Sequence, residues 1–82
     1  MWFVYILRSI TRKWYYVGST NFLERRLNEH NSGKVKSTKS YKPFIIIFRK
    51  EFTTEKEARE YEKKVKRCRI EKERIIKNSG IV

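Results

Sequence analysis

The sequence predicts an α+β fold, a small three-stranded antiparallel sheet flanked by helices. Strand-forming aromatic and β-branched residues concentrate in three segments, which are residues 2–7, 14–17 and 44–48. Apolar residues at helical spacing follow the second and third of these segments, in residues 21–32 and from residue 54 to about residue 69. At 82 residues the chain has the length of one domain, and we expect residues 1–82 to form it.

The first two strand segments are expected to form a hairpin. Within residues 2–7 the side chains alternate between two faces, as they do in a strand. Residues 9–12, mostly polar, then provide a turn, and the strand pattern resumes at Trp14. Gly18 is expected to mark a strand end or a tight bend.

The register of this hairpin decides whether its tyrosines meet. If Arg8 pairs with Lys13, Tyr5 lies directly opposite Tyr16, with the Cβ atoms about 5 Å apart on one face. A slip of one residue would separate the two rings.

The next segment predicts a helix over residues 21–32. Asn21 followed three residues later by Glu24 is typical of a capping box, and Gly33 stands where a left-handed residue ends a helix.

Two neighbouring strips of this helix differ in character. Leu23 and Leu27 lie one turn apart and would pack on the sheet. Arg26 and His30 have the same spacing on the adjacent strip, which we expect to face the tyrosines of the hairpin.

The segment before the third strand is mostly polar and basic. Residues 34–42 are mainly Lys, Ser, Thr and Tyr, which favours a surface loop that contacts phosphates without discriminating between bases. Pro43 ends this loop. The continuous apolar run Phe44–Phe48 favours a strand buried on both faces and therefore central, or nearly central, in the sheet.

A second capping-box pair, Thr54 with Glu57, begins the second helix. An apolar stripe at helical spacing follows, made of Ala58, Tyr61, Val65 and Cys68. Beyond Arg69 the pattern weakens, so that a short third helix and a continuation of the second helix to about Lys77 both fit the spacing.

The charge balance indicates a nucleic-acid partner. The chain carries 21 Lys and Arg against 9 acidic residues, a formal net charge of +12, which disfavours the compact state unless a polyanion offsets it. We expect DNA to be that polyanion, with RNA as an open alternative. The oligomeric state is left open.

Other features favour a cytoplasmic protein without a membrane segment. The apolar run from Trp2 to Leu7 is far shorter than the roughly 20 residues of a membrane span, and it lacks the features of a signal peptide. Cys68 is the single cysteine, which fits a reducing compartment, and we expect it to be a buried or half-buried thiol.

The acidic residues restrict how a metal ion could be held. All of them are glutamates, so a hard cation would bind glutamate, backbone oxygens, water or the phosphate of a substrate, as Mg²⁺ commonly does.

Cleavage of a phosphodiester bond requires a base that activates water, positive charge around the transition state and usually a metal ion. Tyr5, Arg26 and Glu62 could fill these roles. A phenol has an ordinary pKa near 10, so about one in a thousand is ionised at neutral pH and a cation must stabilise the phenolate.

Each of these residues also has a simpler explanation. Tyrosines that alternate in a strand pack a sheet, and Glu62 could pair with Lys66 one helical turn away. His30 could accept a proton from a tyrosine, bind phosphate or act as a cation at the end of a helix.

Taken together, the ordered motifs resemble the GIY-YIG nuclease superfamily, in particular its short, stand-alone bacterial members. The matching segments are Phe3-Val4-Tyr5, Tyr16-Val17-Gly18-Ser19-Thr20, Asn21-x-Leu23-x-x-Arg26, His30-Asn31-x-Gly33-Lys34 and Glu57-Ala58-x-x-x-Glu62-Lys63. The resemblance covers roughly residues 2–67. It implies a three-stranded antiparallel sheet flanked by helices, and hydrolysis of DNA phosphodiester bonds with one divalent metal, Mg²⁺ or Mn²⁺. Phe3 replaces the first glycine of the family motif, and Asn78 lies too late to be matched to an asparagine that some members use.

The resemblance also implies the roles of the catalytic set. Tyr5 matches the first-motif tyrosine, the favoured general base, and Tyr16 matches the second, to which we assign positioning of the water or phosphate. Arg26 matches the helix arginine that stabilises the phosphate, and Glu62 matches the metal-binding glutamate. His30 matches a position where some members have histidine and others tyrosine.

Basic residues outside this set are expected to contact phosphates: Arg25, Lys34, Lys36, Lys39, Lys42, Lys63 and Lys66. We therefore expect an endonuclease that selects the structure of its substrate or is weakly sequence-specific. The alternative is a nucleic-acid-binding module of the same fold with little or no turnover.

Overall fold

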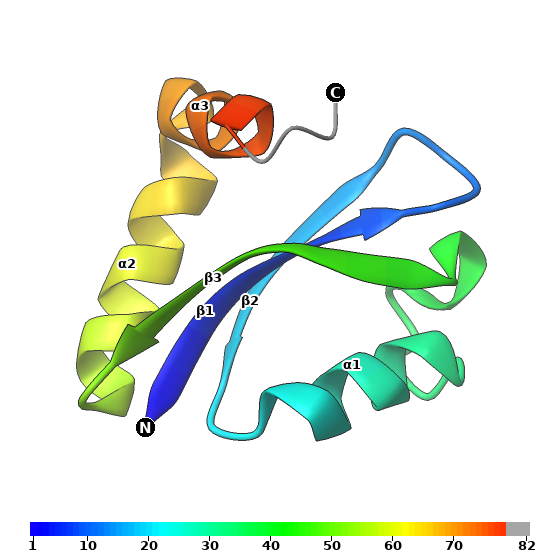
Figure 1. The fold of residues 1–82 in the computed structure, drawn as a ribbon, viewed down its shortest axis with the longest axis horizontal. Coiled ribbons are helices and arrows are strands. Elements are labelled where there is room, and N and C mark those ends of the chain that lie inside the picture. The colour runs from blue at the N-terminus through cyan, green and yellow to red at the C-terminus, as the bar shows by residue number, and fades with distance from the viewer. Residues whose placement is uncertain (79–82) are drawn as a thin grey trace.

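A three-stranded antiparallel sheet with helices on both faces forms the centre of the computed structural model (Figure 1). The elements in chain order are β1 (Trp2–Ser9), β2 (Tyr15–Thr20), α1 (Leu23–Asn31), a short 3₁₀ helix (Lys39–Tyr41), β3 (Phe44–Phe52), α2 (Glu55–Arg67) and α3 (Arg69–Asn78). The structure describes residues 1–78, and residues 79–82 of the predicted domain lie outside it. The predicted α+β class and the three-stranded sheet are confirmed.

The strand order is β2-β1-β3, so β1 is central and the prediction of a central third strand is wrong. The apolar run of β3 arises because helices cover both faces of this edge strand. Ile46 packs in the cluster beside α1, whereas Ile47 and Phe48 pack in the cluster beside α2. Consecutive residues of a strand normally point to opposite faces. An irregularity in the β1–β3 pairing, between Ile6 and Leu7, allows both Ile47 and Phe48 to pack in the cluster beside α2.

The hairpin register differs from the predicted one by two residues. Arg8 pairs with Tyr15, and Tyr5 therefore lies opposite Gly18 instead of opposite Tyr16. The Ser9 amide bonds to the Trp14 carbonyl at 2.9 Å, so the four-residue turn comprises residues 10–13 and lies one residue later than predicted. A shift by two residues keeps both tyrosine rings on the same face of the sheet, as diagonal neighbours.

Helix α1 begins differently from the prediction and ends as predicted. No side chain caps its N-terminus, so the capping box of Asn21 and Glu24 is wrong. The Thr20 hydroxyl instead accepts a hydrogen bond from the Phe22 amide, at 3.1 Å. Gly33 has a φ of +81°, and its amide bonds to the His30 carbonyl, as in a Schellman cap.

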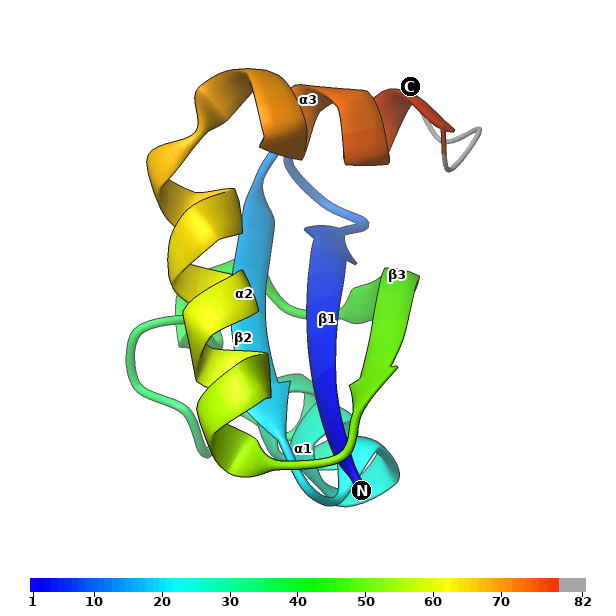
Figure 2. The ribbon, with the colours of Figure 1, turned by 90° about the vertical axis from the view of Figure 1, so that its left-hand side faces the viewer.

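Helix α2 begins at the predicted capping pair, since the Thr54 hydroxyl accepts from the Glu57 amide at 3.3 Å. It ends at Arg67, and the separate helix α3 runs across the end of the sheet at which the β1–β2 turn lies (Figure 2). The alternative of a short third helix is therefore the correct one. Cys68 is the C-cap residue at this break and is exposed, which corrects the predicted buried or half-buried thiol.

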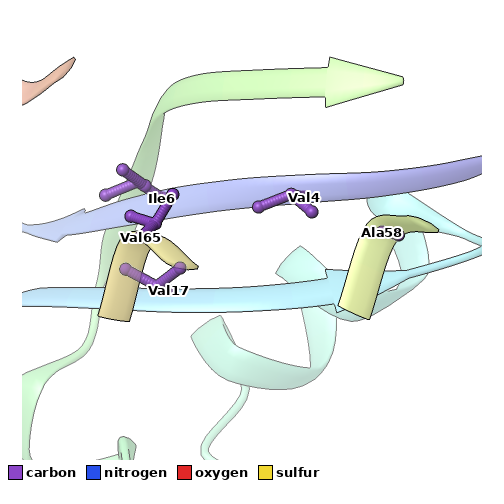
Figure 3. Close-up of a cluster of buried hydrophobic side chains, with 5 residues drawn as sticks. All are labelled: Val4, Ile6, Val17, Ala58 and Val65. Carbon is purple, nitrogen blue, oxygen red and sulfur yellow. The ribbon is translucent and has the colours of Figure 1, made fainter. Parts of the chain in front are cut away.

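Two apolar clusters hold the helices to the sheet. The first consists of Val4, Ile6, Val17, Ala58 and Val65, and Figure 3 shows these side chains between the sheet and α2. The second is built from Tyr5, Leu7, Leu23 and Phe44 on the α1 side, where Leu27 packs as predicted. Successive residues of β1 thus serve opposite faces. No helix within residues 1–78 has the length and apolar character that crossing a membrane requires.

Candidate active site

Tyr5 lies at the centre of a buried cluster of aromatic and polar side chains on the α1 face. Its ring centroid is 6.3 Å from that of Tyr16 and 6.2 Å from that of His30. The Tyr5 hydroxyl lies 3.3 Å from His30 Nε2. The strip of α1 that carries His30 therefore faces the hairpin tyrosines, as the helical spacing predicts.

Gly18 makes room for the Tyr5 ring. A Cβ atom at position 18 would lie 2.6 Å from the Tyr5 hydroxyl oxygen and 2.9 Å from Cε2 of Tyr16, closer than real side chains approach. The phenol therefore lies across the backbone of β2, which is an edge strand of the sheet. The prediction of a strand end or bend at Gly18 is wrong, because β2 continues to Thr20. The glycine instead allows the Tyr5 ring to approach the backbone of β2 closely.

Arg26 brings positive charge to the Tyr5 hydroxyl. Its guanidinium lies near enough to Tyr5 to lower the pKa of the phenol, against the effect of burial, and thereby favours the ionised form. The same side chain pairs with Glu29, with an Nη1–Oε1 distance of 3.1 Å, and is about one-third exposed. Arg26 thus joins the buried phenol to the solvent side of the site.

The resting phenol of Tyr5 is nevertheless neutral. Burial raises the pKa of Tyr5 to about 12, against the opposing hydrogen bond and charge of Arg26 and with smaller contributions from Tyr16 and Glu62. At pH 7 about one molecule in 10⁵ would carry the phenolate. A base role for Tyr5 therefore requires further positive charge at its oxygen.

His30 is fully buried and neutral. Its Nδ1 lies 2.8 Å from the hydroxyl of Thr38, which itself donates to the Val35 carbonyl at 3.4 Å. Thr38 therefore accepts from the Nδ1 proton, and Nε2 is left to accept a hydrogen bond from Tyr5. Burial, assisted by the charge of Arg26, lowers the pKa of His30 to about 4. A role as a charged helix cap at neutral pH is excluded.

Thr38 is a residue of this site that sequence reasoning missed. The surface-loop prediction for residues 34–42 is correct for the exposed lysines and wrong for Thr38, which is completely buried. Within a segment rich in Lys, Ser and Thr, nothing in the sequence distinguishes this threonine from its exposed neighbours.

Glu62 reaches the edge of β2 from α2, on the opposite face of the sheet. Its Oε1 accepts a hydrogen bond from the Ser19 hydroxyl at 2.5 Å, and its Oε2 pairs with Lys66 Nζ at 2.6 Å. The Glu62 side chain is 17% exposed, and its charge contributes to raising the pKa of Tyr5. The expected pairing with Lys66 is confirmed, and the contact with Ser19 was not anticipated.

A divalent cation would find one protein carboxylate here. Within residues 1–78 no group of three or more His, Cys or Glu side chains is arranged to hold a metal ion. A single partly exposed glutamate beside a hydroxyl nonetheless fits Mg²⁺, which keeps several waters and uses substrate phosphates as ligands. Glu62 is the residue of the predicted set with this chemistry.

The predicted phosphate-contacting residues are exposed on the surface. Arg25 lies over the ring of Phe22, 5.4 Å from its centroid, at the start of α1. Lys39 and Lys42 both lie near Gly33, because a Cβ atom there would be 3.6 Å and 3.3 Å from their side chains. Lys66 differs from the others because it is held by Glu62.

The fold and these motifs define the family of the protein. The chain matches the GIY-YIG catalytic domain over residues 1–75 and belongs to the GIY-YIG nuclease family. It is similar to a UPF0213 protein of Oceanobacillus iheyensis, with 40% identity over 76 residues that cover 90% of this chain and 87% of the relative.

Two further relatives agree with this assignment. A UPF0213 protein of Nitratidesulfovibrio vulgaris is 38% identical over 68 residues, which cover 82% of this chain and only 61% of that relative's length. The solution NMR structure of a UPF0213 protein from Bacillus halodurans superposes with a TM-score of 0.58 at 33% identity, covering 99% of this chain and 88% of the other.

Proposed function

We propose that this protein is a metal-dependent endonuclease that hydrolyses phosphodiester bonds in DNA. One observation carries the proposal. The Tyr5 phenol contacts His30, is influenced by the charge of Arg26 and lies across Gly18, at the strand edge that the Glu62 carboxylate reaches from the other face. This arrangement offers a proton acceptor, a cation for phosphate and a metal ligand around one edge.

In this mechanism Tyr5 is the general base and Arg26 stabilises the charge of the phosphate. His30 accepts the hydrogen bond of the Tyr5 hydroxyl and so orients its oxygen. In the resting protein, the raised pKa of Tyr5 and the lowered pKa of His30 both oppose full proton transfer from the phenol to the imidazole. His30 therefore positions the phenol and does not act as the final proton acceptor.

Tyr16 positions the attacking water or the phosphate beside Tyr5. Glu62 would hold the divalent cation, Mg²⁺ or Mn²⁺, by exchanging its contacts with Ser19 and Lys66 for the ion. When bound there, the cation would polarise the phosphate and stabilise negative charge near the Tyr5 oxygen.

Substrate binding in this proposal rests on the basic surface. The exposed lysines of residues 34–42, with Arg25 and Lys63, would contact phosphates and not base edges. The enzyme would therefore be weakly sequence-specific or select the structure of its substrate. RNA remains an alternative substrate, because none of these contacts requires a deoxyribose.

Cleavage of end-labelled branched, flapped, single-stranded and duplex DNA, and of RNA, by the purified protein tests this function. We expect cleavage in Mg²⁺ or Mn²⁺, none in EDTA, and a large loss of cleavage in Tyr5→Phe, Arg26→Ala and Glu62→Ala proteins that retain their fold and their affinity for DNA. Wild-type cleavage by all three variants would refute the assignment.

A second candidate is a nucleic-acid-binding module without useful turnover. The raised pKa of Tyr5 and the occupied oxygens of Glu62 favour it in the absence of a cation. It predicts that the logarithm of the association constant falls as the logarithm of the salt concentration rises, with a slope of about −0.9 for each phosphate neutralised. Cleavage by the wild-type protein that depends on Tyr5 would exclude this alternative.

A further inference from the structure

A cavity of about 420 Å³ lies between the β1–β2 turn and α3, outside the candidate active site. Lys13 and Tyr15 line it from the hairpin, and α3 contributes residues between Arg69 and Lys77. Figure 2 shows α3 lying over this end of the sheet. The volume falls within the range of small-molecule sites, about 300–1,000 Å³.

Basic side chains outnumber acidic ones around the cavity. Its charged lining consists of Lys13, Arg69, Lys72, Lys77 and Glu73. Among the described residues that line it, Glu73 is the one acid, and its Oε1 lies 3.1 Å from Nε of Arg69. The lysines are therefore left to attract an anion at a cavity whose wall is otherwise mainly apolar surface.

Tyr15 gives the same cavity an aromatic wall. The ring is half-buried and packs against the edge of the cluster formed with α2. Arg8 lies opposite Tyr15 in the β1–β2 pairing, so its side chain shares this face of the sheet. The buried Nε of Arg8 has no hydrogen-bond partner within residues 1–78, so a cation with an unused donor lies on the same face of the sheet as Tyr15.

The cavity and the candidate active site share one strand. Tyr15 and Tyr16 are consecutive in β2, so their side chains point to opposite faces, and β2 is an edge of the sheet. Ser19, which holds Glu62, lies four residues further along the same strand, a distance of about 13 Å. A single nucleic-acid strand that follows this edge can therefore contact both places.

We propose that this cavity binds one unpaired nucleotide of the substrate strand, a short distance along that strand from the phosphate at Tyr5 and Glu62. The lysines bind the phosphate, and the Tyr15 ring stacks on the base. Because stacking requires a base free of its partner, the cavity favours single-stranded or flapped ends over blunt duplex. The choice of ligand rests on the nuclease function proposed above, but its test is a binding measurement that requires no cleavage.

The experiment measures the fluorescence anisotropy of a labelled single-stranded oligonucleotide with the full chain in EDTA. Lys72→Ala/Lys77→Ala is compared with Lys56→Ala/Lys64→Ala, which removes the same charge from exposed positions of α2 outside this cavity. We expect the first variant to bind more weakly than the second, and its log-log salt slope to be smaller by about 0.7, the value for one single-strand phosphate contact.

A second pair of variants isolates the stacking. Tyr15→Leu should weaken single-strand binding about 5-fold or more and leave blunt-duplex binding unchanged, whereas Tyr15→Phe should bind both like the wild type. Thermal unfolding of each variant checks that the fold is retained. Equal losses in the two lysine variants, or wild-type single-strand affinity in Tyr15→Leu, would overturn the proposal. If binding follows the prediction but Mg²⁺ produces no cleavage, the cavity assignment stands and the nuclease function fails.

Discussion

The two faces of the central strand are built from different chemistry. Val4 and Ile6 point toward α2 and pack in a cluster of apolar side chains. Tyr5, between them, points toward α1 and is as deeply buried, but it meets His30 and Arg26. The α2 face therefore stabilises the fold through the burial of aliphatic groups. On the α1 face, the free-energy cost of desolvating polar groups offsets part of the stabilisation that burial gives.

This difference explains how so small a domain can hold a polar site. Burial raises the pKa of Tyr5 and lowers that of His30, so the fold keeps both groups in their neutral forms. Their hydrogen bonds to each other and to Thr38 offset the lost contacts with water. Both faces bury apolar side chains, whereas the proposed chemistry depends on the α1 face and the β2 edge.

The largest expected effect is on activity, from Tyr5→Phe on the α1 face. Removal of the hydroxyl should lower the cleavage rate by about 10²–10⁴-fold, the usual contribution of a general base, and cost only about 1 kcal/mol of stability. Single-turnover cleavage and urea unfolding check the two parts. Tyr61→Phe, on α2, is the matched control and should cleave like the wild type.

On the α2 face, Ile6→Ala should give the opposite result. The lost burial and the cavity left behind should lower the free energy of unfolding by about 2–5 kcal/mol, with the cleavage rate per folded molecule unchanged. Ile6→Val, with an expected loss of about 1 kcal/mol, keeps the test usable if the alanine variant does not fold. A large loss of cleavage in folded Ile6→Val would show that the two faces are not separable.

The buried imidazole predicts a specific dependence of stability on pH. Because the pKa of His30 is depressed to about 4 in the fold, its contribution is complete above the unfolded value of 6.5 and is lost as the pH falls toward 4. The expected loss is about 3 kcal/mol between these limits. Urea unfolding of the wild type and of His30→Gln at pH 7.5 and pH 4.5 measures it, and the variant should lack this component. Parallel pH profiles would contradict a buried neutral His30.

The smallest expected effect concerns Lys66, which competes with a cation for Glu62. An exposed pair of this spacing is worth about 0.3–0.5 kcal/mol, so Lys66→Met should tighten Mn²⁺ binding about 2-fold. Titration followed by electron paramagnetic resonance of free Mn²⁺ measures this change. Arg59→Met, which breaks an equivalent pair with Glu55, should leave the affinity unchanged.

The sequence predicts most of the helices and strands, and it predicts which side chains share one face of a helix, because both depend on local spacing. The i,i+4 relation of Arg26 and His30 and the Thr54 cap are examples. What it does not predict depends on contacts between distant segments. The hairpin register depends on how Ser9 closes the turn, and the role of Gly18 depends on the ring that crosses it.

The apolar run of β3 misleads for the same reason. An edge strand that helices cover on both faces has the same continuous apolar sequence as a central strand. The segment Phe44–Phe48 therefore appears central in the sequence. Thr38 shows the limit most clearly, since only the folded loop brings it to His30.

The most direct test of the central idea, a site assembled at the β2 edge from both faces of the sheet, is to locate the bound cation. Substoichiometric Mn²⁺ added to isotopically labelled protein broadens the amide signals of residues near the ion in NMR spectra. The two-sided site predicts broadening centred on Glu62 that includes Gly18, Ser19 and Tyr5, and its loss in Glu62→Gln. Broadening centred elsewhere, or unchanged in that variant, would contradict it.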